Sequence, residues 1–251
     1  MIKCAKIICV YFGNRRVGMY NNPKDMKSFF STMMKNEINI DNGIDTDVIL
    51  VNNIVGRLDN EVNQYVNEYI DVKTKNGKVI VEQRENIGGS FGSYFDMFTK
   101  YLSEYDYFFF CEDDHIIFKE GYMKDFVDFI DSDDKVGYVA LAPITLPGLN
   151  GYPVHSGGGI GLTSTKKFNM IYGENSICNF RHEMTHGQSY NELQNYESRF
   201  NSNFIIHGGF EIKNHPKYSC IPNNYKNFES NYRHYLNEEN LQKEFIYNVG
   251  E

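Results

Sequence analysis

The stretch from Phe108 to Phe118 reads FFFCEDDHIIF and places acidic side chains between two apolar runs. Glu112, Asp113 and Asp114 are consecutive, and carboxylates held this close repel one another. Burying them unpaired is costly, whereas a divalent cation beside them would offset the repulsion. Carboxylate oxygens are the ligands that Mg²⁺ and Mn²⁺ prefer. The stretch therefore predicts a divalent metal site, and the alternative is a solvated acidic turn between two strands.

The elements that would position this cluster alternate between apolar β-branched runs and helical patterns. The predicted strands are Lys6–Phe12, Asp47–Val51, Lys78–Val81 and Tyr107–Cys111, and the predicted helices are Lys24–Lys35, Asn60–Tyr69, Ser90–Leu102 and Tyr122–Ile130. This order predicts an α/β fold with a mainly parallel central sheet and helices on both faces. Ligands bind beyond the carboxyl ends of the strands in such sheets. The acidic cluster follows the fourth strand, so it lies where a ligand site is expected.

The second half of the chain is less regular. Val136–Leu141 reads as a strand, Pro143–Gly161 is turn-rich, Thr163–Tyr172 is a predicted helix and Asn203–His207 a predicted late strand. We expect one domain over residues 1–251, with a donor half at about 1–120 and an acceptor half at about 121–251.

Composition narrows the class of protein. The net charge of −8 argues against a general nucleic-acid binder. No run approaches the roughly 18 apolar residues of a membrane span, and the start of the chain has no small-residue cleavage site. Five cysteines without a CxxC pair indicate neither a disulfide framework nor a cysteine zinc site. We expect a cytoplasmic protein, and action at a membrane surface as a peripheral protein is compatible with this expectation.

The run from Arg84 to Phe126 resembles the central block of family 2-like nucleotide-sugar glycosyltransferases with the GT-A fold. It carries an R-x-N-x-G sequence before a predicted helix, and then a strand ending in Glu-Asp-Asp, a variant of the DxD motif. The likeness in the order of elements covers about residues 5–130 and is sharp only across 84–126. It implies a GT-A-like fold and transfer of a sugar from a nucleotide-diphosphate sugar, with a UDP-sugar favoured, to a hydroxyl of a glycan or glycolipid.

The resemblance also implies roles for individual residues. Asp114 would be the direct ligand of Mn²⁺ or Mg²⁺, and Glu112 or Asp113 would face the ribose or metal-bound water. Such an ion stabilises the charge that grows on the diphosphate as the glycosidic bond breaks. His207 is the first choice for a further metal ligand and His186 the second, with ordinary structural histidines as the alternative.

Substrate contacts are expected from the loops around the same strand ends. The expected contacts are Tyr11, Asn14 and Arg15 for the nucleoside, Asn52 or Asn53 for the base, Arg84 for a phosphate, Asn86 for the ribose or the loop, and Gly158 where SGGGIG lets ligands approach the backbone. Some of these have a structural alternative: a turn at Asn52 and Asn53, a surface ion pair of Arg84 with Glu82 or Glu85, and a flexible loop at SGGGIG. Gly88–Gly89 could bind phosphate through backbone N–H groups or merely begin a helix.

A second stretch, RHEMTHG at Arg181–Gly187, contains a literal HExxH. On a helix this motif places His182 and His186 on one face, with Glu183 beside a zinc-bound water. Gly187 directly after the second histidine would cut such a helix short. The stretch therefore keeps a zinc hydrolase as an alternative, and a non-catalytic nucleotide- or sugar-binding module is another.

Under the glycosyltransferase interpretation the same region would supply a base. An inverting transferase, which we favour, needs a group that takes the proton of the acceptor hydroxyl. Glu183 and Glu192 are the candidates. Because Ser189-x-x-Glu192 is also a helix capping box, which explains Glu192 structurally, Glu183 is preferred.

Overall fold

The computed structural model describes residues 2–10, 23–54, 65–113, 115–117, 119–148, 151–186 and 196–218. Along the chain the helices and strands are β1 (Cys4–Val10), α1 (Pro23–Asn39), β2 (Thr46–Ile54), β3 (Val79–Glu85), α3 (Gly89–Tyr101), β4 (Tyr107–Glu112), α4 (Tyr122–Asp131), β5 (Val136–Ala140), β6 (Ile144–Thr145), β7 (His155–Ser156), η2 (Gly157–Gly159), β8 (Gly161–Ser164), α5 (Thr165–Tyr172), α6 (Phe180–Thr185), α7 (Tyr196–Ile206) and β9 (Glu211–Asn214). None of the described helices is both long and apolar enough to cross a membrane.

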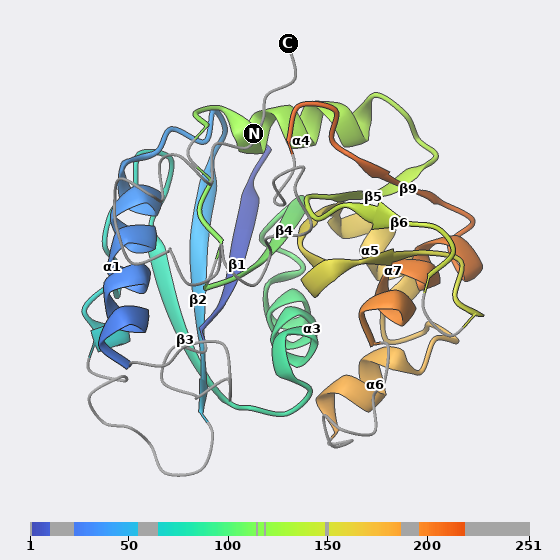
Figure 1. Ribbon diagram of the computed structural model, residues 1–251, viewed down its shortest axis with the longest axis horizontal. Coiled ribbons are helices and arrows are strands. Elements are labelled where there is room, and N and C mark those ends of the chain that lie inside the picture. Colours follow the sequence, from blue (N-terminus) through green and yellow to red (C-terminus); the bar gives the residue numbers. More distant parts are fainter. Residues whose placement is uncertain are drawn as a thin grey trace.

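Within these residues seven strands form a central sheet in the order β3-β2-β1-β4-β8-β5-β9 (Figure 1). All neighbouring strands are parallel except that β8 runs antiparallel to both β4 and β5. Strands from both halves of the chain therefore belong to one sheet. The α/β fold with a mainly parallel central sheet that the sequence predicts is confirmed.

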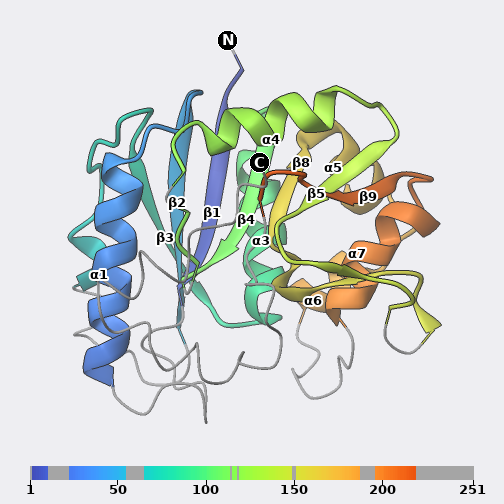
Figure 2. The ribbon, with the colours of Figure 1, turned by 45° about the horizontal axis from the view of Figure 1, so that its top comes forward.

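Helices cover the sheet on both faces, which explains why the central strands are apolar throughout. On one face α1 and α4 pack against the sheet, and on the other α3, α5, α6 and α7 do. Strand β1 shows the division, since alternate side chains enter opposite cores: Cys4, Ile8 and Val10 on the first face, and Ala5, Ile7 and Cys9 on the second. Figure 2 shows the layers of helix, sheet and helix from a second direction.

One charged residue interrupts the apolar run of β1. Lys6 is fully buried, and its Nζ lies 2.5 Å from Oε1 of Glu37 on α1, which is also fully buried. The pair ties α1 to the central strand through the core. Removing one partner of such a pair leaves an uncompensated buried charge.

The structure corrects the predicted elements of the second half. The segment Asn203–His207, predicted as a strand, belongs mostly to helix α7, because Phe200 and Phe204 enter the aromatic core on one helical face. The late strand is instead the polar β9. Gly161–Ser164 is a strand, although Gly161 was predicted to end a turn-rich segment and Thr163 to begin a helix. Helix α5 begins after this strand, where the hydroxyl of Ser164 accepts a hydrogen bond from the Lys167 N–H.

The predicted elements of the first half are confirmed where the structure describes them, except that in the predicted helix Asn60–Tyr69 residues 65–67 are helical and residues 68–69 form a turn. Tyr11 and Phe12, predicted to end the first strand, lie outside the described residues, as do residues 60–64 of the predicted helix Asn60–Tyr69.

Candidate functional site

Polar residues of β2, β3 and β4 lie at the same end of the sheet, with β1 between β2 and β4. The parallel register pairs Val10 with Asn52, Cys9 with Glu112, and Asn53 with Arg84. These pairs all lie at the carboxyl ends of their strands. We call this region the strand edge and define it by Asn52, Asn53, Arg84, Glu112 and Asp113.

Glu112 is the last residue of β4, and its side chain is partly buried. Its Oε1 accepts a hydrogen bond from the hydroxyl of Ser90 in the first turn of α3. A Cβ placed on Gly158 would lie 3.8 Å from Glu112 Oε2, so the glycine turn faces the other oxygen. Asp113 is 8% exposed, and its backbone N–H donates to the carbonyl of Cys9 at 3.1 Å. The strand edge thus holds two acidic side chains between a helix N-terminus and a glycine turn.

The chemistry of these donors fits a hard divalent cation, because both are carboxylates. Asp114, the predicted direct ligand, lies outside the described residues. Among the residues that the structure describes, no three His, Cys, Asp or Glu side chains gather closely enough to hold a metal ion. A metal bound here would therefore need ligands in addition to Glu112 and Asp113, and the metal site stays a prediction.

The glycine turn of SGGGIG is held against the sheet by two tyrosines. The hydroxyl of Tyr94 donates to the Gly158 carbonyl at 3.2 Å, and the hydroxyl of Tyr138 donates to the Gly159 carbonyl. Burial raises the pKa of both tyrosines, so both hydroxyls remain protonated donors. Gly158 has φ +64, a conformation that L side chains rarely adopt. This stretch is therefore a fixed wall beside Glu112 and not a free loop.

Arg84 is engaged by the protein itself. Its Nε lies 2.7 Å from Asp96 Oδ2, its Nη1 donates to Asn53 Oδ1 at 2.9 Å, and its Nη2 donates to the Ile87 carbonyl at 2.8 Å. The hydroxyl of Ser93 also donates to Asn53 Oδ1 at 2.7 Å. These bonds give Arg84 a structural role in joining β3, β2 and α3. They leave the predicted phosphate contact without geometric support.

The structural alternative weighed for Arg84 also differs from what the structure shows. Its ion-pair partner is Asp96 and not Glu82 or Glu85. Glu82 instead accepts hydrogen bonds from Lys100 at 2.7 Å and from the Tyr101 hydroxyl. Since Asp96 and Arg84 are twelve residues apart on different elements, only the packing of α3 on the sheet could reveal this pair.

The three asparagines of the predicted substrate site differ in their surroundings. Asn52 and Asn53 are 3% and 2% exposed at the end of β2, and Asn53 belongs to the Arg84 network. Asn86, in the segment between β3 and α3, has a buried Oδ1 that accepts no hydrogen bond from the described residues. A buried acceptor without a donor is costly, so Asn86 is available to a ligand hydroxyl or amide.

The glycine pair before α3 has a packing reason. Gly88 has φ +70, and a Cβ on it would lie 1.9 Å from the carbonyl oxygen of Met184. Helix α6 therefore packs directly on the start of α3, and only glycine fits between them. The helix-entry interpretation of Gly88–Gly89 is supported, while phosphate binding there stays a prediction.

The HEMTH stretch forms α6, a helix of six residues, and His186 lies at its C-terminal cap. The rings of His182 and His186 are stacked, with centroids 4.1 Å apart and 6° between the planes. The Glu183 carboxylate lies 2.6 Å from Nη2 of Arg199 on α7. A zinc hydrolase would need Glu183 beside metal-bound water. Its engagement with Arg199 therefore counts against the zinc alternative.

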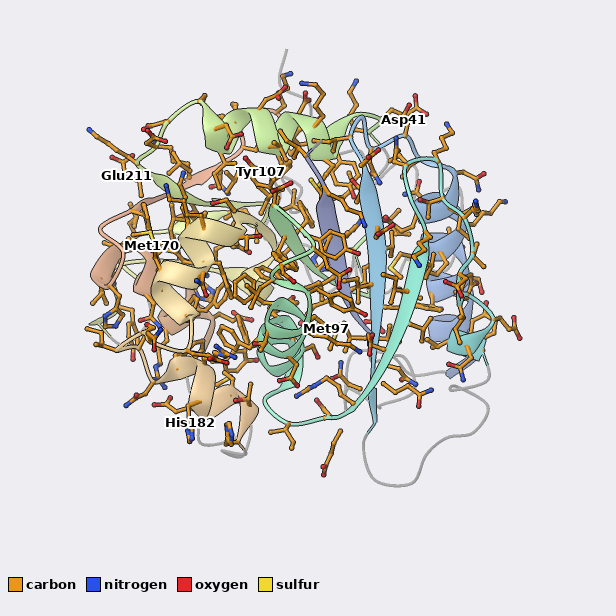
Figure 3. All side chains as sticks on the ribbon, turned by 180° about the vertical axis from the view of Figure 1, so that it is seen from behind. Asp41, Met97, Tyr107, Met170, His182 and Glu211 are labelled. Atoms are coloured by element: carbon orange, nitrogen blue, oxygen red, sulfur yellow. The ribbon has the colours of Figure 1, made fainter. Side chains whose placement is uncertain are left out.

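His207 is not brought near the acidic cluster. It follows α7 and precedes β9 by four residues, and β9 begins beside the start of β5 at the amino ends of the parallel strands. Figure 3 shows Glu211 and Tyr107, at the amino ends of β9 and β4, far from His182 on α6. Glu112 lies at the opposite, carboxyl end of β4, so the structure does not support His207 as a partner of Glu112 in one metal site.

Five predicted site residues lie outside the described residues: Tyr11, Asn14, Arg15, Asp114 and Glu192. Their roles stay predictions.

The structure adds His155, which the sequence analysis did not consider. Its Nδ1 lies 3.0 Å from the hydroxyl of Ser198, and its Nε2 lies 3.6 Å from a carboxylate oxygen of Glu197. Burial lowers the pKa of His155, which favours the neutral imidazole. His155 comes directly before the glycine turn. No local sequence pattern indicates this environment of His155, because both of its partners are more than forty residues away on α7.

Comparison of the sequence with family models gives no match, and no curated protein matches either.

Solved structures share parts of the arrangement at low identity. They include TarS from S. aureus in complex with UDP (TM-score 0.36, 16% identity, covering 60% of this chain), a cytidylyltransferase from Leptospira borgpetersenii (0.42, 12%, 88% of this chain and 81% of that one), and a protein described as a nucleotide-diphospho-sugar transferase from Desulfovibrio desulfuricans (0.45, 12%, 97% and 95%). This chain spans 37% of the TarS chain. Likenesses this distant do not decide an activity, so the proposal below rests on the site.

Proposed function

We propose that this protein transfers a sugar from a nucleotide-diphosphate sugar, with a UDP-sugar favoured, to a hydroxyl of a glycan or glycolipid acceptor. The observation that carries the proposal is the position of Glu112 and Asp113. Two carboxylates stand at the carboxyl end of a parallel strand, between the start of α3 and a fixed glycine turn. Ligands of α/β sheets bind at this edge.

The residues around the carboxylates have the properties that a diphosphate sugar requires. Glu112 and Asp113, together with Asp114, would hold Mn²⁺ or Mg²⁺, which when bound neutralises charge on the diphosphate leaving group. We assign to Asn86, whose buried Oδ1 accepts no hydrogen bond from the described residues, the contact with a ribose hydroxyl. The glycine turn lets a sugar approach the backbone closely, because Gly158 has no side chain to obstruct it.

The base that takes the proton of the acceptor hydroxyl is proposed to come from the segment 183–192, with inversion at the sugar. Of its two candidates, Glu183 is held in an ion pair with Arg199. To accept a proton it would have to give up that pair, which makes it a poorer base. We therefore propose Glu192 as the base and Glu183 as the residue that joins α6 to α7.

Thermal melting with a panel of nucleoside diphosphates, each with and without Mn²⁺, tests the donor site. A ligand that binds only the native state raises the melting temperature, by roughly 5–10 °C at a hundredfold excess over its Kd. We expect such a rise to need both the metal and one nucleotide. A rise without turnover of any sugar donor would favour the binding module, and no rise with any nucleotide would contradict the proposal.

A further inference from the structure

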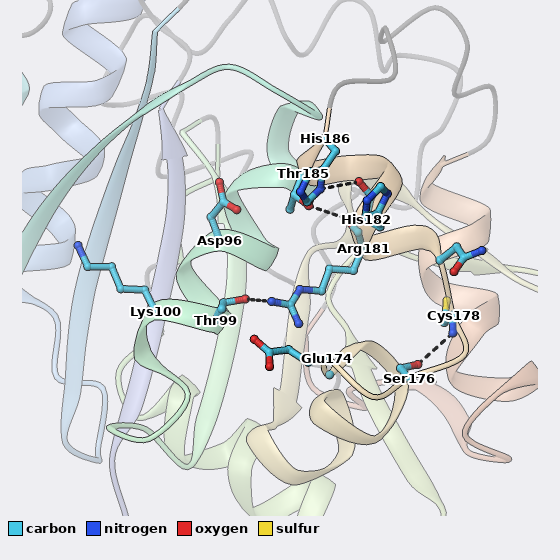
Figure 4. A pocket seen from close by; sticks show the side chains of 12 residues that line it. Asp96, Thr99, Lys100, Glu174, Ser176, Cys178, Arg181, His182, Thr185 and His186 are labelled. Atoms are coloured by element: carbon cyan, nitrogen blue, oxygen red, sulfur yellow. Dashed lines mark hydrogen bonds between the residues drawn. The ribbon is translucent and has the colours of Figure 1, made fainter.

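A hollow lies beside α3 and is lined by Asp96, Thr99 and Lys100 of that helix. It is a cavity of about 680 Å³ between α3 and the segment that joins α5 to α6 (Figure 4). This volume falls within the range of small-molecule sites. Neither Glu112 nor Asp113 lines it, so the cavity is separate from the acidic cluster.

The charges in the cavity wall cancel. The lining contains two acidic residues, Asp96 and Glu174, and two basic ones, Lys100 and Arg181. Two of these charges have partners on the sheet, since Asp96 pairs with Arg84 and Lys100 with Glu82, each at 2.7 Å. A wall without net charge gives no general attraction for a phosphate or a cation.

The wall instead offers donors and acceptors side by side. Figure 4 shows Arg181 reaching from α6 to α3, where its Nη2 donates to the hydroxyl of Thr99 at 2.6 Å. The exposed Asn179 contributes an amide from the connecting segment, whereas the Ser176 hydroxyl there donates to the Ile171 carbonyl and accepts from the Cys178 N–H. Polyols, whose hydroxyls donate and accept in equal measure, suit such a surface.

One end of the cavity carries a flat surface. The rings of His182 and His186 are stacked and nearly parallel, with 6° between their planes, and both residues are exposed. Planar rings pack well against flat apolar faces, and the C–H face of a pyranose is one of these. The two histidines of HEMTH would therefore contact a sugar ring and would not bind zinc.

The cavity also adjoins the strand edge. Asp96 in its wall is joined through Arg84 to Asn53 at the end of β2. At the other side α6 packs on Gly88, immediately before the helix whose Ser90 contacts Glu112. Saccharide units in the cavity would therefore contact α3, the helix whose Ser90 reaches Glu112.

We propose that this cavity binds neutral saccharide units of a glycan. That the glycan is the acceptor rests on the proposed function, whereas binding of saccharide does not.

The test uses an array of neutral oligosaccharides built from glucose, galactose and N-acetylglucosamine, with sialylated glycans for comparison. The full chain is compared with two variants. Asn179→Trp places a large side chain in the cavity, at an exposed position whose side chain caps no helix. Asn175→Trp is the matched control, because Asn175 is exposed in the same segment but does not line the cavity.

We expect at least one neutral oligosaccharide to be retained by the full chain and by Asn175→Trp, and its affinity to fall about tenfold or more in Asn179→Trp. Unchanged retention by Asn179→Trp, retention of acidic glycans alone, or no retention would overturn the inference. Melting with UDP and Mn²⁺ is measured on the same samples. Retention of glycan without any response to nucleotides would leave the inference standing and remove the proposed function.

Discussion

The strand edge and helix α6 carry the two acidic motifs of this protein, and their surroundings differ. Glu112 and Asp113 stand at the end of a buried strand whose register is set by hydrogen bonds to β1. Glu183 sits on a six-residue helix that lies on α3, and it is engaged by Arg199. A functional site needs rigid elements that hold its side chains together. On that ground the strand edge is the better candidate.

The largest expected effect separates the two glutamates near α6. Glu192→Gln should lower the turnover of the sugar donor by about 10²–10⁴-fold, as the loss of a general base does. Glu183→Gln should lower it less than about tenfold, because this carboxylate already serves an ion pair. Steady-state rates with the donor identified by melting provide the measurement, and UDP affinity should stay unchanged in both variants. The reverse order of effects would restore Glu183 as the base.

The second prediction compares the ion pairs that stabilise the two regions. Glu37→Gln should lower the free energy of unfolding by about 3–5 kcal/mol, since it leaves Lys6 charged and unpaired beneath the strand edge. Burial lowers the pKa of Lys6, but Glu37 and its neighbours more than offset this and the pKa is raised. Arg199→Gln, which breaks the more exposed pair at α6, should cost about 1 kcal/mol or less.

Urea denaturation measures both changes. The double variant Lys6→Met/Glu37→Leu should recover most of the lost stability, because a buried pair is often replaced by apolar groups without loss. Equal effects of the two single variants would contradict the contrast between a buried and a surface pair.

The third prediction concerns metal-dependent binding. Asp113→Asn should weaken the binding of UDP in the presence of Mn²⁺ by up to about 100-fold, the range in which support of a metal site acts. His182→Gln should leave this affinity unchanged, because His182 lies on α6. Isothermal titration with and without Mn²⁺ distinguishes the two. Weakened binding in His182→Gln alone would move the metal site to α6.

The smallest expected effect concerns buried and exposed histidines. His215 is 5% exposed, stacks on Phe126 and receives a hydrogen bond from the Lys217 N–H at 3.1 Å. Burial lowers its pKa, although the backbone and carboxylate of Asp125 act in the opposite direction. Between the lowered pKa and the usual value of about 6.5 the unfolded chain binds more protons, so stability falls as pH drops.

His215→Gln should therefore reduce the loss of stability between pH 7.5 and pH 5.5. His182→Gln provides the same substitution at an exposed position. Urea denaturation at the two pH values gives the comparison, and an identical slope for His215→Gln and the unaltered chain would contradict it.

The first half of the fold was predictable from periodicity because each element is long and its strands are apolar throughout, as in KIICVYF and YFFFC. The segment NFIIH was mistaken for a strand because its apolar run is as compatible with a buried helical face. The segment is helical because Phe200 and Phe204 pack together among the aromatic rings of the second core. Strand β8 was missed because its residues GLTS carry little apolar signal and its pairing partners are distant in sequence.

In the candidate site, too, some features were predictable from the sequence and others were not. Placement of Glu112 and Asp113 at a strand end followed from the sequence, because a parallel α/β order fixes which end of a strand faces the ligand. The partners of Arg84, Glu183 and His155 did not, since each pairs with a residue on another element. For this reason the predicted phosphate contact of Arg84 has no geometric support. His207 has none as a metal ligand because it lies toward the amino ends of the strands, whereas Glu112 lies at a carboxyl end.

By itself the sequence determined the order of strands and helices in the first half, the two-sided burial of the sheet and the position of the acidic cluster, all of which depend on local periodicity and on chain order. Only the tertiary structure decided which charges are engaged, which glycines form walls, and that a neutral cavity lies beside α3. These features depend on contacts between residues far apart in the chain, and no local pattern encodes such contacts.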